Sequence, residues 1–233
     1  NKPKTRAFLL SYVTGIFFWL GIIYWLMHVT FIGMIVLVFY LALYFGIFGL
    51  VVSTPLFSTR YSLLFIPAFW VMLEFIRSHL FTGFPWAFLG YSQYLNLAII
   101  QIADITGAWG VSFLVMLVNL ALYSIMSSES GVMSGKRGAT ERIKNLIIPA
   151  ILFFFVLGYG FYALQTPNPK LQTRQPIKIS VIQGNILQEL KWEKSSRDFI
   201  MERYFSISAE TLKDKPDLII WPEAALPVVL EED

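Results

Sequence analysis

Cysteine is absent from the 233 residues, and histidine occurs only twice, as His28 and His79. Without cysteine, these residues can form no disulfide, no cysteine-ligated zinc site and no thiol nucleophile. The two histidines are too few and too far apart in the sequence to form a recognisable metal motif. We therefore expect no cofactor and no metal in this chain.

Charge is also scarce. Charged residues make up 14% of the chain, whereas soluble domains contain about 25%. Hydrophobic residues make up 56% and the mean hydropathy is +0.63, so the composition indicates a membrane protein. The net charge of +3 is small. The basic residues flank apolar runs instead of clustering on one folded face, so we expect no nucleic-acid partner.

Five apolar runs are each long enough to cross a hydrocarbon core of about 30 Å as a helix. The first run is too long for the apolar region of a signal peptide, and no small-residue cleavage site follows it. The predicted spans are residues 7–29, 32–52, 61–79, 109–126 and 146–164. The sequence therefore predicts a transmembrane helical domain over residues 1–164.

The connections between these runs differ in charge. Segments 1–6, 53–60 and 127–145 contain Lys and Arg residues, whereas segments 30–31 and 80–108 contain none. Because Lys and Arg are enriched in cytoplasmic loops, the N-terminus should be cytoplasmic. With five spans, the residues after position 164 then lie outside.

Two charged residues, Glu74 and Arg77, interrupt the third apolar run. They are three residues apart, so they share one helix face and can pair. A charge at mid-bilayer costs about 2.5–3.5 kcal/mol on insertion scales, so such groups usually face protein or a watery cavity. The two residues can form a polar wall beside a substrate chamber or a structural pair near the interface. Asn119, in the fourth run, is expected to make an interhelical hydrogen bond.

The long connection over residues 80–107 is apolar and aromatic but is interrupted by Gly and Pro. It contains Gly83-Phe84-Pro85-Trp86 and Gly90-Tyr91-Ser92-Gln93. This composition suits a re-entrant or interfacial wedge, and an ordinary aromatic belt at the headgroup layer is the alternative.

After a proline-containing linker at residues 165–176, the pattern changes to strand, helix and strand. Residues 177–183 predict a strand, Ser195 or Ser196 can cap a helix that runs to about Leu212, and Leu218–Trp221 predict a second strand. Such a unit should have parallel strands. Two strands are too few to be stable alone, so we expect the chain to be an internal piece of a longer protein.

Glu223 follows the second predicted strand. Pro222 cannot extend a central ladder, so the strand should end there. Glu223 then lies just past the carboxyl end of a strand, where catalytic groups of open α/β sheets are found. A solvated loop glutamate is the alternative interpretation.

The segments 177–185, 190–192 and 218–227 together resemble the start of a nitrilase-type domain of the carbon–nitrogen hydrolase superfamily. Combined with Thr82-Gly-Phe-Pro-Trp86 and Gly90-Tyr-Ser-Gln93 in a preceding helical bundle, the chain resembles the apolipoprotein N-acyltransferases of the bacterial inner membrane. The resemblance implies a membrane α-helical bundle followed by the start of an α/β nitrilase-like domain, over residues 177–233, on the periplasmic side.

The resemblance also implies a Glu-Lys-Cys triad. In this family a cysteine takes a fatty acyl group from a phospholipid as a thioester and passes it to the N-terminal amine of a diacylglyceryl-cysteine apolipoprotein. Glu223 matches the general base, and Trp192 matches a tryptophan near the substrate entrance. The family's lysine and cysteine belong to later segments that this chain lacks, so residues 1–233 alone should be inactive. The other candidate substrate-binding residues are Trp86, Phe84, Glu74 and Arg77.

Two further interpretations of the sequence remain open. The chain can be part of a non-catalytic membrane transporter or scaffold with a small extracytoplasmic cap, in which Glu74 and Asn119 line a substrate path. It can also be part of a membrane-tethered, nitrilase-like amidase that acts on small amides.

Overall fold

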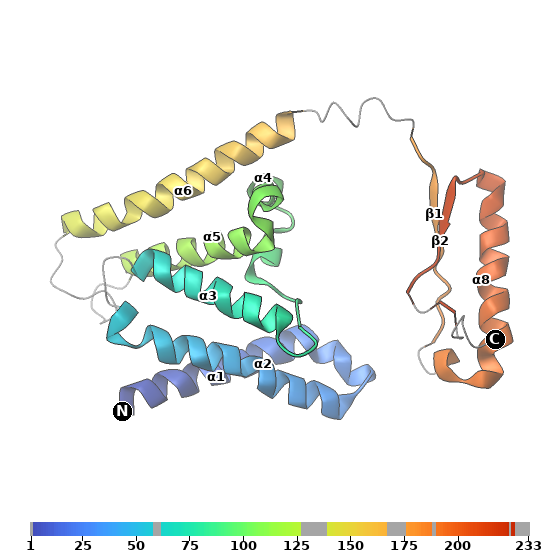
Figure 1. The fold of residues 1–233 in the computed structure, drawn as a ribbon, viewed down its shortest axis with the longest axis horizontal. Helices are drawn as coiled ribbons and strands as arrows, with labels where there is room; N and C mark the ends of the chain where they lie inside the picture. Colours follow the sequence, from blue (N-terminus) through green and yellow to red (C-terminus); the bar gives the residue numbers. More distant parts are fainter. Residues whose placement is uncertain are drawn as a thin grey trace. The chain divides into compact units, whose positions relative to one another are not determined.

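The computed structural model describes residues 2–57, 62–126, 139–166, 176–187, 190–223 and 225–226, and Figure 1 shows its ribbon. By their internal contacts the residues divide into two compact units, Asn1–Pro167 and Asn168–Asp233. The first unit is helical, and the second contains a small parallel sheet with one longer helix.

Five long helices make up the described part of the first unit. They are α1 (Lys2–Ile23), α2 (Phe31–Val52), α3 (Ser62–His79), α5 (Ala103–Met126) and α6 (Ala139–Gln165). Shorter helical pieces connect them: η1 (Tyr24–His28), η2 (Pro55–Phe57), η3 (Leu89–Gln93) and α4 (Leu97–Ile100). Successive long helices run in opposite directions, so α1, α3 and α6 begin at the same end of the unit (Figure 1).

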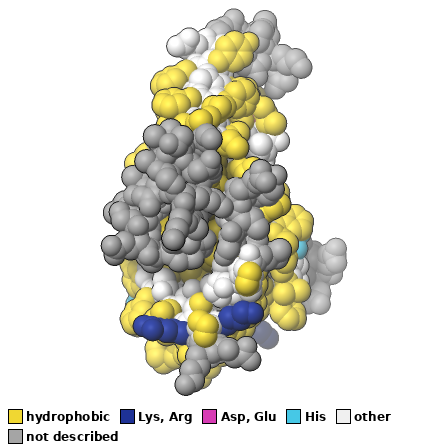
Figure 2. All heavy atoms as spheres, turned by 90° about the vertical axis from the view of Figure 1, so that its left-hand side faces the viewer, with side chains coloured by type: hydrophobic (Ala, Val, Ile, Leu, Met, Phe, Trp, Pro, Cys, Tyr) yellow, Lys and Arg dark blue, Asp and Glu magenta, His cyan; other side chains and the backbone are white. Residues whose placement is uncertain are grey.

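Four segments of the described residues are long and apolar enough to cross a membrane: Pro3–His28, Phe31–Val52, Ala103–Ser124 and Leu146–Gln165. They correspond to α1 with η1, α2, α5 and most of α6. The helix α3 has 18 residues but contains Glu74, Arg77 and His79 in its second half, and it is not among the four. Many large hydrophobic side chains of the unit are exposed, and those on one face of it are yellow in Figure 2.

Two helices begin earlier than the hydropathy predicts. The fourth predicted span starts at residue 109, but α5 starts at Ala103 and is interrupted at Gly107, whose φ of 65° and ψ of −175° are not helical. Glycine tolerates this backbone conformation without steric cost. The sequence also treats residues 127–145 as a connection, whereas α6 already begins at Ala139. Charged residues at a helix end lower the local hydropathy without ending the helix.

Buried residues of the helical unit, where the structure describes it, form two clusters. Trp19 and Ile23 of α1 pack against Met34, Val38 and Leu41 of α2. A second cluster, Ile99, Ile102, Val111, Leu114 and Val156, joins α4, α5 and α6. The Thr30 hydroxyl caps α2 by accepting a hydrogen bond from the Gly33 N–H at 3.2 Å. The α1–α2 cluster extends toward the loop after α3, because Phe84 and Ala87 pack against it.

The second unit contains β1 (Ile179–Val181), α8 (Arg197–Thr211) and β2 (Leu218–Ile220). The two strands pair in parallel, with Ser180 opposite Ile219, which confirms the predicted parallel pairing. Both strands are shorter than predicted. The short helical segments η4 (Leu190–Trp192), η5 (Lys194–Ser196) and η6 (Leu212–Asp214) flank α8. Ser196 precedes α8, but its side chain makes no capping hydrogen bond, so the predicted cap is wrong.

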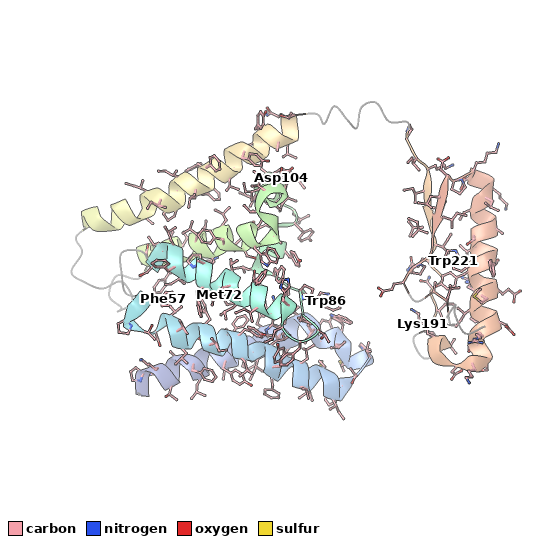
Figure 3. All side chains as sticks on the ribbon, viewed as in Figure 1. Phe57, Met72, Trp86, Asp104, Lys191 and Trp221 are labelled. Carbon is pink, nitrogen blue, oxygen red and sulfur yellow. The ribbon has the colours of Figure 1, made fainter. Side chains whose placement is uncertain are left out.

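The core of this unit lies between the sheet and α8. Ile182, Ile200, Tyr204 and Ala225 are buried there. Trp221, which follows β2, stacks on Tyr204 with ring centroids 5.2 Å apart. Its indole Nε1 donates to the Ser208 hydroxyl of α8 at 2.9 Å. Trp221 therefore holds the carboxyl end of β2 against the helix (Figure 3).

Candidate functional site

The predicted site residues fall into two groups, one in each unit. In the helical unit, Glu74 and Arg77 of α3 are almost completely buried, with 3% and 4% of their surface exposed. Glu and Arg are rarely this buried unless they are paired. Their partners therefore indicate what the two charges do.

Arg77 binds the backbone of the loop that follows α3. Its Nη1 donates to the carbonyl oxygens of Phe84, at 3.0 Å, and Trp86, at 2.7 Å. Its guanidinium carbon lies 4.9 Å from the ring centroid of Trp19 and 5.3 Å from that of Phe88, which is within cation–π range. One buried cation thus fixes the loop between residues 84 and 88.

Glu74 holds the next part of the same loop. Its Oε1 accepts from the backbone N–H of Leu89 at 2.7 Å and from the indole Nε1 of Trp70 at 3.0 Å. Within the described residues, Oε2 has no hydrogen-bond partner although it is buried. Glu74 therefore links α3 to the start of η3 and retains one unused acceptor.

Glu74 and Arg77 interact electrostatically, but the hydrogen bonds of their described side chains do not join the two residues. The two residues share a buried face of α3, but their hydrogen bonds go to the indole of Trp70 and to the loop backbone. The reason is geometric. The loop folds back over the end of α3 and brings two carbonyls and one N–H within reach, and hydrogen bonds to charged groups contribute about 1.5–3 kcal/mol each.

The backbone of this loop is unusual. Phe81 and Ala87 have φ values of 58° and 53°, in the left-handed region, which costs energy for residues other than glycine. Gly83 also has a positive φ of 75°, and a Cβ there would collide with the carbonyl oxygen of Ser78. The bonds from Arg77 and Glu74 counteract this strain and hold the loop in one path.

The aromatic side chains of the loop are presented differently. Phe84 is partly buried and meets Trp19 edge-on at 5.7 Å. Trp86 is 51% exposed and stacks on Trp25 of η1 at 5.4 Å, beyond the end of α3 (Figure 3). Several more apolar residues of the connection are exposed: Phe81, Tyr91, Tyr94, Leu95, Leu97 and Ile105. The connection forms the short helices η3 and α4 and no span, and its exposed aromatic residues suit a membrane interface.

Asn119 does not make the predicted interhelical bond. Its Nδ2 donates to the carbonyl of Val115, one turn earlier in α5, at 2.8 Å, and its side chain is exposed. A polar side chain in an apolar helix can satisfy itself on its own backbone, which the sequence pattern does not distinguish from a contact between helices.

In the second unit, Glu223 lies in the turn directly after Trp221-Pro222, past the carboxyl end of β2. Its side chain is exposed. It makes no hydrogen bond or ion pair with the described residues of this unit. The N–H of Ala225 donates to the carbonyl of Pro222 at 3.2 Å and closes the turn. Since the strands are parallel, Gln183 and Asn185 follow β1 at the same edge of the sheet.

Trp192 is the last residue of η4, and its side chain lies outside the described part of the chain. Glu223 and Trp192 thus belong to one unit, whereas Trp86, Phe84, Glu74 and Arg77 belong to the other. Nowhere in the described ranges do three or more His, Asp or Glu side chains gather as a possible metal site.

Sequence reasoning missed three residues that organise the helical site. Trp70 is four residues before Glu74, a spacing that places both on one helix face and could have indicated their hydrogen bond. Trp19 and Trp25 contact Arg77 and Trp86 across about 60 positions of sequence. No local pattern signals those two contacts.

Comparison with known proteins places the helical unit in a family. A family model described as the apolipoprotein N-acyltransferase N-terminal domain matches residues 1–121. This range includes α1 to α3, the loop held by Arg77 and Glu74, and most of α5. The chain belongs to the apolipoprotein N-acyltransferase family.

Individual relatives extend this similarity into the second unit. The apolipoprotein N-acyltransferase of Geobacter metallireducens is 35% identical over 100% of this chain and 46% of its own length. That of Vibrio cholerae is 34% identical over 97% of the chain and 44% of its own length. That of Coxiella burnetii is 33% identical over 83% of the chain and 37% of its own length. The chain thus spans somewhat less than half the length of the curated relatives that it matches.

Family membership and the four membrane-capable helices together support a multi-pass protein of the inner membrane. The finer assignments depend on the arrangement of the residues described above.

Proposed function

We propose that the protein transfers a fatty acyl group from a phospholipid, through a cysteine thioester, to the N-terminal amine of a diacylglyceryl-cysteine apolipoprotein. The observation that carries this proposal is the 35% identity, over the whole chain, to a relative named apolipoprotein N-acyltransferase. Within residues 1–233, Glu223 is the proposed general base. The lysine and the nucleophilic cysteine of the triad are supplied by sequence outside these residues, which contain no cysteine.

The proposed chemistry has two half-reactions. In the first, the Glu223 carboxylate takes the thiol proton, the thiolate attacks the ester carbonyl of the phospholipid, and the lysophospholipid leaves as an alcohol after it takes up that proton. In the second, Glu223 takes a proton from the lipoprotein amine, which attacks the thioester and releases the thiol. A general base must be held within hydrogen-bond reach of the proton that it takes. The strand-helix-strand unit supports this role because Trp221 fixes the strand end that carries Glu223.

We propose that α3 crosses the membrane as a fifth span. The direction of the helices supports this, because α2 ends and α5 begins at opposite ends of the unit, and α3 connects those ends (Figure 1). The charges of α3 do not prevent insertion, because Glu74 and Arg77 are buried and hydrogen-bonded to protein. Charged groups are tolerated in spans under that condition.

In the proposed topology the N-terminus is cytoplasmic, and residues 177–233 form the start of a periplasmic nitrilase-like domain. Figure 2 shows the end of the bundle where α1 begins, and the charged side chains visible among its coloured atoms are Lys and Arg. Lys4 and Arg6 are exposed near that end. The connection 80–102 at the opposite end has no Lys or Arg, and Arg77 beneath it is buried. This asymmetry is the one that marks the cytoplasmic side.

The loop held by α3 is the proposed entry for the acyl chain. Trp86 is exposed and supported by Trp25, so it can contact a lipid chain directly, with Phe84 beneath it. Glu74 and Arg77 are covered by the loop and act on substrate only through it, as positioning residues. In the nitrilase-like unit, Trp192 is a proposed substrate-binding residue.

The amidase and transporter alternatives give different outcomes in one experiment. The purified complete protein is incubated with phospholipid carrying a radiolabelled acyl chain, with and without a synthetic diacylglyceryl-cysteine lipopeptide. We expect a labelled thioester on the enzyme without lipopeptide, and label on the peptide amine when it is added. Hydrolysis of small amides without acyl transfer would favour the amidase, and an absence of both reactions would remove the acyltransferase assignment.

A further inference from the structure

A small cavity lies among α1, α2, α3 and the loop after α3. The residues that line it are Trp19, Tyr44, Phe45, Trp70, Leu73, Glu74, Arg77 and Ala87. Its volume is about 20 Å³. A single water molecule needs a cavity of roughly 10–15 Å³. The cavity therefore has room for one water and for no lipid or peptide group of appreciable size.

Two polar atoms on the lining residues have no hydrogen-bond partner among the side chains and backbone groups that the structure describes. They are the indole Nε1 of Trp19 and the Oε2 of Glu74. Trp19 and Glu74 are 2% and 3% exposed, so bulk water does not satisfy them. Burying a polar atom without a partner is costly, and native proteins rarely leave one in that state.

The two atoms are complementary in a way that one water satisfies. The indole N–H only donates, and a carboxylate oxygen only accepts. A water oxygen can accept from the indole, and a water hydrogen can bond to the carboxylate. Arg77 and Tyr44 also line the cavity and contribute further polar atoms, so the water can reach the two to four partners that buried waters usually have.

We propose that this cavity is a binding site for one ordered water molecule that bridges Trp19 Nε1–H and Glu74 Oε2. The bridge links α1 to α3 beneath the loop. Glu74 then uses both oxygens: Oε1 holds the N–H of Leu89 at 2.7 Å, and Oε2 holds the water. Trp19 becomes a positioning residue for the loop through this water and through its contact with Arg77. This inference does not depend on the acyltransferase reaction.

Trp109 provides a matched control within the same molecule. Its indole Nε1 is also buried without a partner among the described atoms, but Trp109 is not one of the residues that line the cavity. A signal that reflects burial alone would therefore be seen at both indoles. A signal from a water bound in the cavity would be seen only at the Trp19 indole.

The test is a water-to-indole NMR transfer experiment on the protein in lipid nanodiscs, with tryptophan labelled with nitrogen-15. Trp19→Phe and Trp109→Phe assign the two signals. We expect a cross-peak between bound water and the Trp19 N–H and none for Trp109. Equal cross-peaks at both, or none at Trp19, would overturn the proposal.

A second measurement does not depend on any variant being folded. A structure of the unmodified protein in nanodiscs, at a resolution where ordered waters are visible, should contain one isolated density peak within hydrogen-bond distance of both Trp19 Nε1 and Glu74 Oε2. An empty cavity would overturn the proposal, as would a direct bond between the two side chains or density from a lipid. If Trp19→Phe folds, the same peak should disappear, because the water then loses its donor.

Discussion

Arg77 and Glu74 are buried charges that both make hydrogen bonds to backbone groups of one loop. Arg77 satisfies two carbonyls and Glu74 satisfies one N–H. Loop carbonyls and N–H groups that are covered by protein need partners as much as side chains do. At the scale of single residues, these two charges therefore determine where the aromatic side chains of the loop lie.

Replacing Arg77 with Met should loosen the loop. The change keeps an apolar stem of similar length but leaves the carbonyls of Phe84 and Trp86 without their donor. Hydrogen bonds to charged groups contribute about 1.5–3 kcal/mol each, so we expect a clearly lower melting temperature and faster proteolysis within residues 80–95. Arg6→Met removes an exposed arginine and is the control, which should melt like the unmodified protein. Equal melting of both variants would remove the structural role of Arg77.

Glu223→Gln in the complete protein should stop formation of the acyl-enzyme. Glutamine keeps the shape of the side chain but cannot accept a proton, and removing a positioned general base typically lowers the rate about 10²–10⁴-fold. The measurement is the thioester-linked label after incubation with labelled phospholipid. Glu210→Gln, an exposed change at the end of α8, should retain the normal rate. A Glu223→Gln protein that acylates normally would make Glu223 an ordinary loop residue.

At the scale of elements, the connection between α3 and α5 is a folded structure in its own right. It contains η3 and α4, it is tied to α3 by Arg77 and Glu74, and the Gly90 N–H donates to the Ser112 hydroxyl of α5 at 2.8 Å. Its exposed side chains are mostly large and apolar. An element with a fixed backbone and exposed aromatic residues can offer a preformed surface to lipid without a further ordering cost.

Trp86→Ala should therefore weaken use of the phospholipid donor more than it weakens the chemical step. An aromatic contact contributes about 0.5–1.5 kcal/mol, so the phospholipid concentration for half-maximal rate should rise roughly 2–10-fold. The maximal rate should change less. Tyr162→Ala removes an aromatic side chain of α6 that is 66% exposed and should have no such effect. An unchanged response to limiting phospholipid would exclude Trp86 from donor binding.

At the scale of the whole molecule, the chain consists of a lipid-compatible helical unit and a small α/β unit. The proposed reaction needs both, because the acyl donor is a membrane lipid and the acceptor is an exported protein. In the proposed topology, five alternating spans and the Lys and Arg asymmetry put the α/β unit outside the cytoplasm.

Single cysteines at Ser134 and Asn168 test this topology, since residues 1–233 contain no cysteine of their own. In spheroplasts, a membrane-impermeant maleimide should label the position-168 variant and leave the position-134 variant unlabelled until the membrane is opened. Labelling of both from the same side would contradict five spans.

Residues 1–233 expressed alone should insert into the membrane but form no acyl-enzyme, because the proposed nucleophile is a thiol and this segment has none. Label retained on the purified segment after denaturation, above that of a heat-treated control, would show that another residue is acylated and would overturn the triad assignment.

Much of this architecture follows from local patterns in the sequence. The apolar runs predict the helices, the Lys and Arg positions predict an orientation, and the strand around Leu218–Trp221 predicts the parallel pair that β1 and β2 form. Each of these depends on neighbouring residues, so a single sequence is enough to read it. The predicted helix boundaries are less accurate, because Asp104 near the start of α5 and the charged residues at the start of α6 hide helical turns from a hydropathy pattern.

Only the tertiary structure decided what the charges of α3 bind. The spacing of Glu74 and Arg77 indicates that they share a face, but not that a loop folds back over them, nor that Trp19 of α1 lies over the guanidinium. The unfilled hydrogen-bonding capacity of Trp19 and Glu74 is likewise visible only when both line one cavity. The physical reason is that a hydrogen bond or a ring contact depends on distances of a few ångströms between segments far apart in the chain, and these distances are set by the packing of the whole bundle.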